Sequence, residues 1–440
     1  MIARPTLGPL NAWQAPRPTV TTLGNGLTVW AYDLPGQYIA TASLILELPI
    51  NAEPTDGLAL VTVRCLDEGT ESHPGVSFTE ALEGLGGQFH GLVGQSTTQC
   101  SIDVPTDHLA DCLPLLAEIV SQPELNDETV ERVRNNRLAE IDQQLAHGGV
   151  LAAHALRRAL LADGLRLARP LGGTAESVAS VTPTAVRRYR AASYRPDQAV
   201  LIIAGDLTGV NLTNAVETAL AGWSPAASPT TTPEVPAPGR LGHQMIPRPG
   251  AVQTDLRLGW YGIDRSDERW APLQVALTIM GGSFLSRLNA QLREQRGYTY
   301  GVALTPRPFR TGGTIELSSS TRTDAARAML EETLDILSLP TPFTVAETEA
   351  AIGFLAGSVP LSLDTADAIA DQAATLAAAR LPLNYVDRLL TELSRVTPDQ
   401  ATAAYRALVI PEQTAIVEVG DVSPIRPSPG PPVGHPPQQR

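Results

Sequence analysis

The stretch VTPTAVRRYRAASYRPDQAVLIIAGD, residues 181–206, returns in outline as VTPDQATAAYRALVIPEQTAIVEVGD, residues 396–421. Valine, threonine, both prolines, glutamine, glycine and aspartate recur at one constant offset of 215 residues, from 181 to 396. In each copy a Thr-Pro pair typical of a helix start precedes a helical stretch, and an apolar β-branched run typical of a strand follows. One long internal repeat predicts two homologous halves.

The earlier segments of each half follow a common order as well. A strand comes first, then a helix, a glycine pair, further strands, an amphipathic helix that a proline ends, and another helix. In the first half these features lie at residues 39–48, Gly86-Gly87, 101–104, 109–120, Pro123 and from Asn126 or Asp127 past Glu140; in the second half they lie at residues 256–260, 273–279, Gly281-Gly282, 314–317, 326–337, Pro340 and from about Thr344. The sequence therefore predicts an α+β protein of two homologous lobes, each a mostly antiparallel sheet covered by helices.

A segment rich in proline, serine and threonine separates the two halves. Residues 224–240 read SPAASPTTTPEVPAPGR, a composition that favours an extended linker over a helix or strand. We therefore expect an N-terminal extension at 1–22, a first lobe at 23–223, the linker at 224–240, and a second lobe at 241–421. The remainder, 422–440, is dense in proline and is expected to be disordered, and it resembles a PxxP ligand.

The composition narrows the classes of partner. The 440 residues carry 32 basic side chains, all arginine, and 46 acidic ones, so the net charge is −14, which argues against nucleic acid or an anionic membrane as the main partner. The first residues lack the apolar run of a signal peptide, and no stretch is long enough to span a membrane, so a cytoplasmic protein is expected. The three cysteines show neither disulfide nor CxxC spacing.

Several short motifs of the first half resemble the N-terminal lobe of the pitrilysin/insulinase metallopeptidases. They are Gly57-Leu58-Ala59, Gly69-Thr70, Leu85-Gly86-Gly87, Gly172-Gly173-Thr174 and the strand VLIIAGDL from residue 200. The second half resembles the other lobe of that family, so the likeness runs from about Leu23 to Asp421. The resemblance implies that the two lobes form half of a clamshell.

Members of that family hold zinc through an H-x-x-E-H helix, in which two histidines bind the metal and the glutamate deprotonates a bound water. Counted from the flanking motifs, the five positions are residues 60–64, which read Leu-Val-Thr-Val-Arg. Leu60 replaces the first histidine, Val63 the glutamate and Arg64 the second histidine, whose guanidinium would repel a metal ion. Glu140 falls where the resemblance places a third ligand. It is expected either to pair with Arg64 or to be an ordinary helix-surface glutamate.

Other side chains do not rebuild the motif. The seven histidines include no H-x-x-E-H and no pair four residues apart, and Gly148-Gly149 interrupts the only helical pair, His147 and His154. His108 and Cys112 lie four residues apart, where burial of the thiol is the more plausible role. We expect no metal in this chain.

The second half, by contrast, retains motifs of the active family members. Gly281-Gly282-Ser283 leads to Arg293 and, seven residues on, Tyr300. In the family this arginine binds substrate carbonyls and the tyrosine hydroxyl steadies the developing oxyanion at a zinc held by another lobe. We therefore expect Arg293 and Tyr300 to be the functional pair and the glycine turn to bind substrate. Tyr298 is the alternative tyrosine, placed on the same expected strand and expected to face the other way.

The resemblance then implies a function for the whole chain. Bacterial members include heterodimers in which one subunit carries H-x-x-E-H with zinc and the other carries the Arg/Tyr pair. This chain is expected to be the Arg/Tyr subunit, inactive alone, acting on peptides such as precursor or leader peptides.

The alternatives are an inert peptide-binding or scaffold protein, or a homodimeric peptide-binding module. An unrelated hydrolase is disfavoured because G-x-S-x-G, P-loop and dinucleotide motifs are missing.

Overall fold

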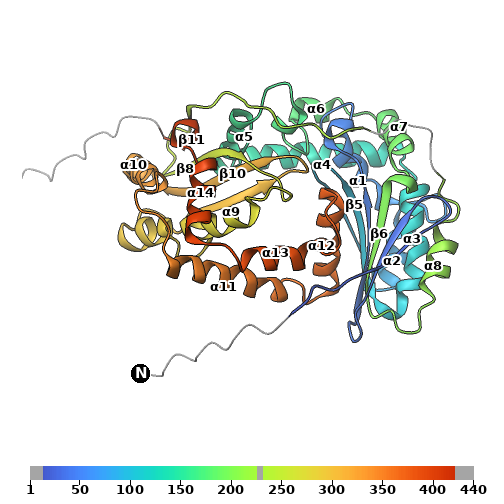
Figure 1. Ribbon diagram of the computed structural model, residues 1–440. Helices are drawn as coiled ribbons and strands as arrows, with labels where there is room; N and C mark the ends of the chain where they lie inside the picture. Colours follow the sequence, from blue (N-terminus) through green and yellow to red (C-terminus); the bar gives the residue numbers. More distant parts are fainter. Residues whose placement is uncertain (1–12, 225–230, 422–440) are drawn as a thin grey trace, which may run out of the picture.

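The computed structural model describes residues 13–224 and 231–421 and places them in two α+β units side by side (Figure 1). The start of the chain, part of the linker and the predicted proline-rich tail with its PxxP segment lie outside the described residues. Among the described helices, none combines the length and the apolar character needed to cross a membrane.

The first unit is a sheet of six strands in the order β1-β2-β6-β3-β5-β4, counted over the described residues. The strands are β1 Thr19–Thr22, β2 Thr28–Asp33, β3 Ile39–Leu46, β4 Gln88–Val93, β5 Thr98–Pro105 and β6 Ala199–Gly205. The helices are α1 Leu58–Val63, α2 Val76–Gly84, α3 Leu109–Ser121, α4 Asp127–Leu145, α5 Gly148–Leu160, α6 Ala175–Ala179, α7 Pro183–Ser193 and α8 Leu212–Leu220. Only β2 and β6 pair in parallel; the other neighbours are antiparallel.

The second unit repeats this sheet without the counterpart of β1. Its order within the described chain is β7-β11-β8-β10-β9, and again a single pair, β7 with β11, is parallel. The strands are β7 His243–Pro247, β8 Gln253–Gly262, β9 Ala303–Pro308, β10 Gly313–Arg322 and β11 Ala415–Gly420. The helices are α9 Trp270–Leu277, α10 Ala326–Leu337, α11 Val345–Leu361, α12 Ala366–Ala379, α13 Tyr385–Leu393 and α14 Pro398–Leu408. The predicted α+β fold with two mostly antiparallel, helix-covered sheets is confirmed.

Local sequence signals explain most of these elements. The repeated Thr-Pro pairs begin α7 and α14, where the Thr182 and Thr397 hydroxyls accept hydrogen bonds from the helix N–H groups and proline occupies the first turn. In α3 the four residues predicted at helical spacing, from Leu109 to Val120, are all buried at 1% exposure or less. Asn126 caps α4 by accepting a hydrogen bond from Thr129 N at 2.8 Å.

The two units exchange a helix. Helix α5, from the first half of the chain, packs on β8 and β11 of the second sheet, and α12 packs on β3 and β6 of the first (Figure 1). Gly259 of β8 makes room for α5, because a Cβ there would lie 2.7 Å from Leu160 Cδ1. Under α12, Ile369 packs with Ile45 and Ile202. Each sheet is thus covered on one face by its own helices and on the other by a helix of the opposite unit.

The described part of the linker runs along the first unit in an extended form. Residues 231–240 contain neither helix nor strand, and Pro238 forms an isolated bridge with Leu161. The Glu234 carboxylate accepts hydrogen bonds from Arg166 N and Leu167 N, both at 2.9 Å, and Gly239 N donates to Leu160 O at 3.0 Å. On this basis we propose that the lobes span 23–223 and 241–421. The four residues of β1 belong to the predicted N-terminal extension and add an edge strand to the first sheet.

Candidate functional site

The glycine turn of the second unit is shaped by close contact with β9. Helix α9 continues into a widened turn at Thr278–Gly282, and a second such turn spans Asn289–Gln295. A Cβ on Gly281 would lie 2.7 Å from the Cβ of Leu304, so a glycine is required for the turn to lie this near the strand. This contact positions the backbone of Gly282 and Ser283 at the edge of a pocket.

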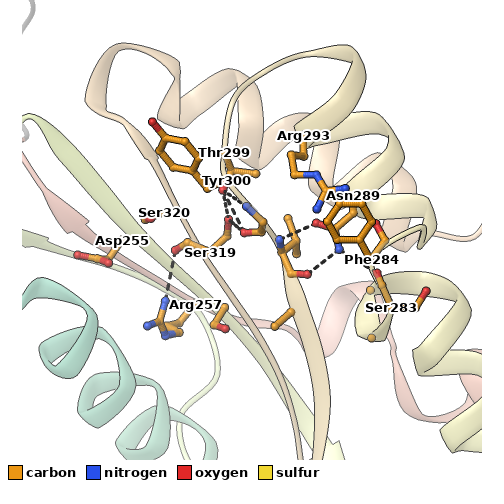
Figure 2. A pocket seen from close by; sticks show the side chains of 16 residues that line it. Asp255, Arg257, Ser283, Phe284, Asn289, Arg293, Thr299, Tyr300, Ser319 and Ser320 are labelled. Atoms are coloured by element: carbon orange, nitrogen blue, oxygen red, sulfur yellow. Dashed lines mark hydrogen bonds between the residues drawn. The ribbon is translucent and has the colours of Figure 1, made fainter. Parts of the chain in front are cut away.

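That pocket, about 560 Å³ in volume, brings together the residues expected from the sequence of the second half. Gly281, Gly282, Ser283, Arg293 and Tyr300 all line it. Figure 2 shows Arg293 and Tyr300 along one side of the pocket, with Arg257 and Asp255 on the opposite side. The structure therefore gathers the predicted Arg/Tyr pair and glycine turn into one site.

Arg293 is held in place by the turn it faces. Its guanidinium carbon lies 3.6 Å from the centroid of the Phe284 ring, and Nη2 donates to Phe284 O at 3.2 Å. Nε donates to the Glu294 carboxylate at 2.9 Å. Cation–π stacking and these hydrogen bonds orient the planar guanidinium beside the pocket and leave part of its donor set for a ligand.

The Tyr300 side chain, by contrast with Arg293, is not held by contacts with the rest of the described chain. It is 95% exposed, and within the described residues its hydroxyl has no hydrogen-bond partner. The backbone on which it sits is nevertheless well held, because Thr299 is buried and its hydroxyl meets the Ser319 hydroxyl at 3.0 Å. The Asn289 amide also donates to Val302 O at 3.0 Å. The phenol therefore projects from a fixed segment.

The strand expected at Tyr298 and Tyr300 is wrong. Residues 296–302 are irregular, and β9 begins only at Ala303. Tyr298 packs against the core of the second unit whereas Tyr300 is exposed, so the two do face different ways. On a regular strand, side chains two positions apart lie on the same face. The opposite orientations of Tyr298 and Tyr300 therefore come from the irregular backbone. The hydrogen bonds of Thr299 explain why no regular strand forms here.

In the first unit, the five positions of the missing zinc motif lie on α1 and at its end. Val63 is fully buried, Leu60 is half-buried, and Arg64 is the residue that ends the helix. Val63, Arg64 and Glu140 line a pocket of about 310 Å³, separate from the Arg/Tyr pocket in its lining residues.

An ion pair occupies this pocket. Arg64 Nη1 donates to both carboxylate oxygens of Glu140 at 2.8 Å, so the predicted pairing is present. Arg137 Nη1 adds a third hydrogen bond at 3.0 Å. Burial raises the pKa of Glu140, but the two arginines outweigh it, and that pKa lies below its ordinary value.

This arrangement does not fit a zinc ion. Leu60 and Val63 offer no ligand atom, and the guanidinium of Arg64 has donors only. Both oxygens of Glu140 are already engaged by cationic donors. Over residues 13–224 and 231–421, no group of three or more histidine, cysteine, aspartate or glutamate side chains is arranged to hold a metal.

Sequence reasoning missed the opposite wall of the Arg/Tyr pocket. Asp255 and Arg257 lie there on β8, beside Ser318 and Ser320 of β10. The sequence pattern could have indicated this polar face, because Asp255 and Arg257 alternate with the buried Leu256 and Leu258 along one strand. Only the fold reveals that this polar face meets the glycine turn.

Comparisons with known protein families agree with this architecture. The model described as Insulinase (Peptidase family M16) matches residues 39–175, and the model described as Peptidase M16 inactive domain matches residues 180–352. An uncharacterized zinc protease of Streptomyces coelicolor is 24% identical over 395 residues, covering 88% of this chain and 86% of that protein. A non-peptidase homolog of Helicobacter pylori is 22% identical, covering 78% of this chain and 79% of its own length.

Solved structures show the same fold. A peptidase M16 inactive domain from Pseudomonas fluorescens superposes with a TM-score of 0.86 at 25% identity, covering 93% of this chain and 99% of that one. A protease from Helicobacter pylori superposes with a TM-score of 0.83 at 14% identity, covering 92% and 100%. With both halves of the sequence matched by family models and the whole two-lobed fold shared, the chain belongs to the M16 family, the pitrilysin/insulinase peptidases, as a member whose own zinc motif is lost.

Proposed function

We propose that this chain is the Arg/Tyr-carrying subunit of a heterodimeric zinc metalloendopeptidase. The zinc would lie on a homologous partner with an intact H-x-x-E-H helix, and the peptide would be enclosed between the two subunits. The observation that carries the proposal is that Arg293, Tyr300 and the glycine turn share one open pocket. The Arg64–Glu140 ion pair, at the place where the family holds zinc, supports assigning the zinc to the partner subunit.

The chemistry of the pocket suits a supporting role in peptide hydrolysis. A guanidinium can donate several hydrogen bonds in one plane to substrate carbonyls, and a phenol can donate one directed bond to a forming oxyanion. Tyr300 extends from the surface with its hydroxyl uncommitted within the described residues, so it can reach an active site on another polypeptide. The names of the relatives, a zinc protease in one case and a non-peptidase homolog in the other, are compatible with either half of such a pair.

We infer that the substrates are extended peptides, precursor or leader peptides among them, and that the complex works in the cytoplasm. Cys65, Cys100 and Cys112 are free and buried, and burial raises the pKa of each thiol. Three unpaired thiols in one chain are typical of a reducing compartment.

The proposal is tested by co-expression with a homologous H-x-x-E-H chain, assayed for bound zinc and peptide cleavage against each chain alone. We expect activity only from the pair. In the assembled complex, Arg293→Ala and Tyr300→Phe should each lower kcat by about tenfold or more, as removal of an oxyanion donor does.

Matched control variants lie within the same segment. Arg296→Ala removes an arginine that pairs with Glu332 outside the pocket, and Tyr298→Phe removes a hydroxyl from a core tyrosine. Both should leave kcat near wild type. Bound zinc and peptide cleavage by this chain alone would refute the proposal. Full activity of the Arg293 and Tyr300 variants would favour the alternative of an inert peptide-binding or scaffold protein.

A further inference from the structure

The wall of the Arg/Tyr pocket opposite Tyr300 carries a second arginine, Arg257 of β8 (Figure 2). On β8 its side chain alternates with the buried Leu256 and Leu258, so it lies on the face of the sheet that meets α5. The β10 residue directly opposite Arg257 is Ser318, and Ser320 is opposite Asp255. Arg257 and these two serines of the neighbouring strand β10 therefore form one wall of the site.

Arg257 is half-buried, yet it has no ion-pair partner. Across the described chain no carboxylate oxygen lies within 4 Å of its guanidinium nitrogens. Nη1 donates to the main-chain oxygens of Leu256 at 2.9 Å and Ser319 at 3.3 Å, and Nη2 reaches Gly149 O at 3.4 Å. A guanidinium has five N–H donors, so donors remain for a ligand. A half-buried guanidinium whose hydrogen bonds go only to carbonyl oxygens can gain a charge-assisted bond from an incoming anion.

Asp255 lies two residues before Arg257 on the same face of β8 and lines the same pocket, but it forms no direct ion pair with Arg257. Its Oδ1 and Arg257 Nη2 lie 3.3 and 3.1 Å from the position that a Cβ of Gly149 would take. Its carboxylate lies against the start of α5, with Oδ2 2.3 Å from the position a Cβ of Gly148 would take. A carboxylate at the N-terminus of a 13-residue helix is stabilised by the helix dipole. Burial lowers the pKa of Arg257 below its ordinary value, and the charges of Asp255 and Glu316 offset this effect only in part.

We propose that Arg257, with the hydroxyls of Ser318 and Ser320, forms a carboxylate-binding subsite of this pocket. Resting on the proposed function, this subsite selects peptides that carry a carboxylate near the segment held by Arg293. The carboxylate is either an acidic side chain or the C-terminal group of the peptide. The fork of Arg257 would bind its two oxygens, as guanidinium groups bind carboxylates elsewhere.

Direct peptide binding to the full chain tests the subsite. The probes are four fluorescently labelled, unstructured peptides of one sequence, with a central glutamate or glutamine and with a C-terminal acid or amide. Measured by fluorescence anisotropy, we expect the form with the recognised carboxylate to bind about tenfold tighter or more than its neutral counterpart. The arm that shows the preference, side chain or C-terminus, identifies the source of the carboxylate.

Variants then assign the preference to Arg257. Arg257→Gln should abolish it, and Arg257→Lys should keep part of it, because the charge remains while the planar fork is lost. Arg327→Gln is the matched control, since this α10 arginine is 92% exposed and lies outside the pocket, and it should keep the full preference. Far-UV circular dichroism and thermal melting establish that each variant is folded.

The outcomes separate this inference from the proposed function. Equal binding of all four peptides by the wild-type chain, or binding of none, overturns the subsite, as does a preference that persists in folded Arg257→Gln. A carboxylate preference without partner-dependent cleavage would leave the subsite standing and remove the peptidase role. Partner-dependent cleavage with no preference for peptide carboxylates would remove the subsite and leave the peptidase role standing.

Discussion

Arg64, at a position where the sequence predicts a lost zinc ligand, binds Glu140, at the position predicted for the third ligand. The pair is only partly shielded, with side-chain exposures of 37% and 39%, so its value to stability is small. Its effect on charge is larger, because Glu140 is held ionised between Arg64 and Arg137. A carboxylate in that state resists both protonation and capture by a metal.

We expect Arg64→Ala to raise the pKa of Glu140 toward its ordinary value, since one of its two arginine donors is lost. The free energy of unfolding should fall by about 1 kcal/mol or less. A carboxyl carbon-13 NMR titration measures the pKa, and denaturant unfolding measures the stability. Arg132→Ala is the control, because Arg132 pairs with Glu68 and not with Glu140. An unchanged Glu140 pKa in Arg64→Ala would contradict this account.

At the scale of elements, helix α11 is tied to the glycine turn that shapes the Arg/Tyr pocket. Thr344 caps the helix in a capping box with Glu347. Glu347 also accepts hydrogen bonds from Arg287, at 2.7 Å from Nε and 2.8 Å from Nη2, and Arg287 stacks over the Phe343 ring. These contacts fix the stretch after the turn against the start of a helix.

The Arg287 hydrogen bonds, opposed by partial burial and aided by Thr344, lower the pKa of Glu347 from 4.5 to about 2. Because the folded pKa lies below the unfolded one, the carboxylate stabilises the fold above about pH 4.5. This contribution is lost as the pH falls toward 2. Glu347→Gln keeps the capping box but loses the charge, so it should cost about 1 kcal/mol at neutral pH. Chemical unfolding across this pH range should show the two stabilities converging in acid.

Glu349 provides the control on the same helix, because its side chain is exposed and it takes no part in the capping box. Glu349→Gln should follow the wild type at every pH. A constant difference between wild type and Glu347→Gln from neutral pH down to pH 2 would refute the role of the Arg287 pair.

For the whole molecule, the exchanged helices α5 and α12 join two units that the repeat alone would leave independent. Helix α12 buries Ile369, Ala370 and Ala373 against the first sheet, each at 5% exposure or less. Helix α5 does the same on the second sheet, where Leu156 and Leu160 pack beside Gly259. Neither sheet can keep both faces covered if the other unit unfolds.

We therefore expect one cooperative unfolding transition in urea for both units. Single-tryptophan variants that retain Trp30 in the first unit or Trp260 in the second should report the same midpoint. Ile369→Ala should lower the stability seen by both reporters by about 2–4 kcal/mol, the cost of a large-to-small change in a core. Ile352→Ala, on a partly buried residue within the second unit, should cost less. Two separated transitions in the wild type would show that the helix exchange does not couple the units.

The sequence alone determined the repeat, the α+β class, the caps of α4, α7 and α14, and the loss of ligands at residues 60–64. Each of these depends on neighbours within a few residues or on a comparison between the two halves. Through its resemblance to the family's Arg…Tyr segment, the sequence also pointed to Arg293 and Tyr300, although it assigned a strand where Thr299 and Ser319 hold an irregular segment.

Only the tertiary structure decided which surfaces meet. The polar wall with Arg257 opposite the glycine turn and the exchange of α5 and α12 both join residues that are distant in the chain. An apolar stripe shows that a helix face will be buried, but not against which sheet. A charged residue in a strand shows which face is polar, but not what lies across from it. Long-range packing supplies both answers, because it is settled by the shape and burial of the whole chain.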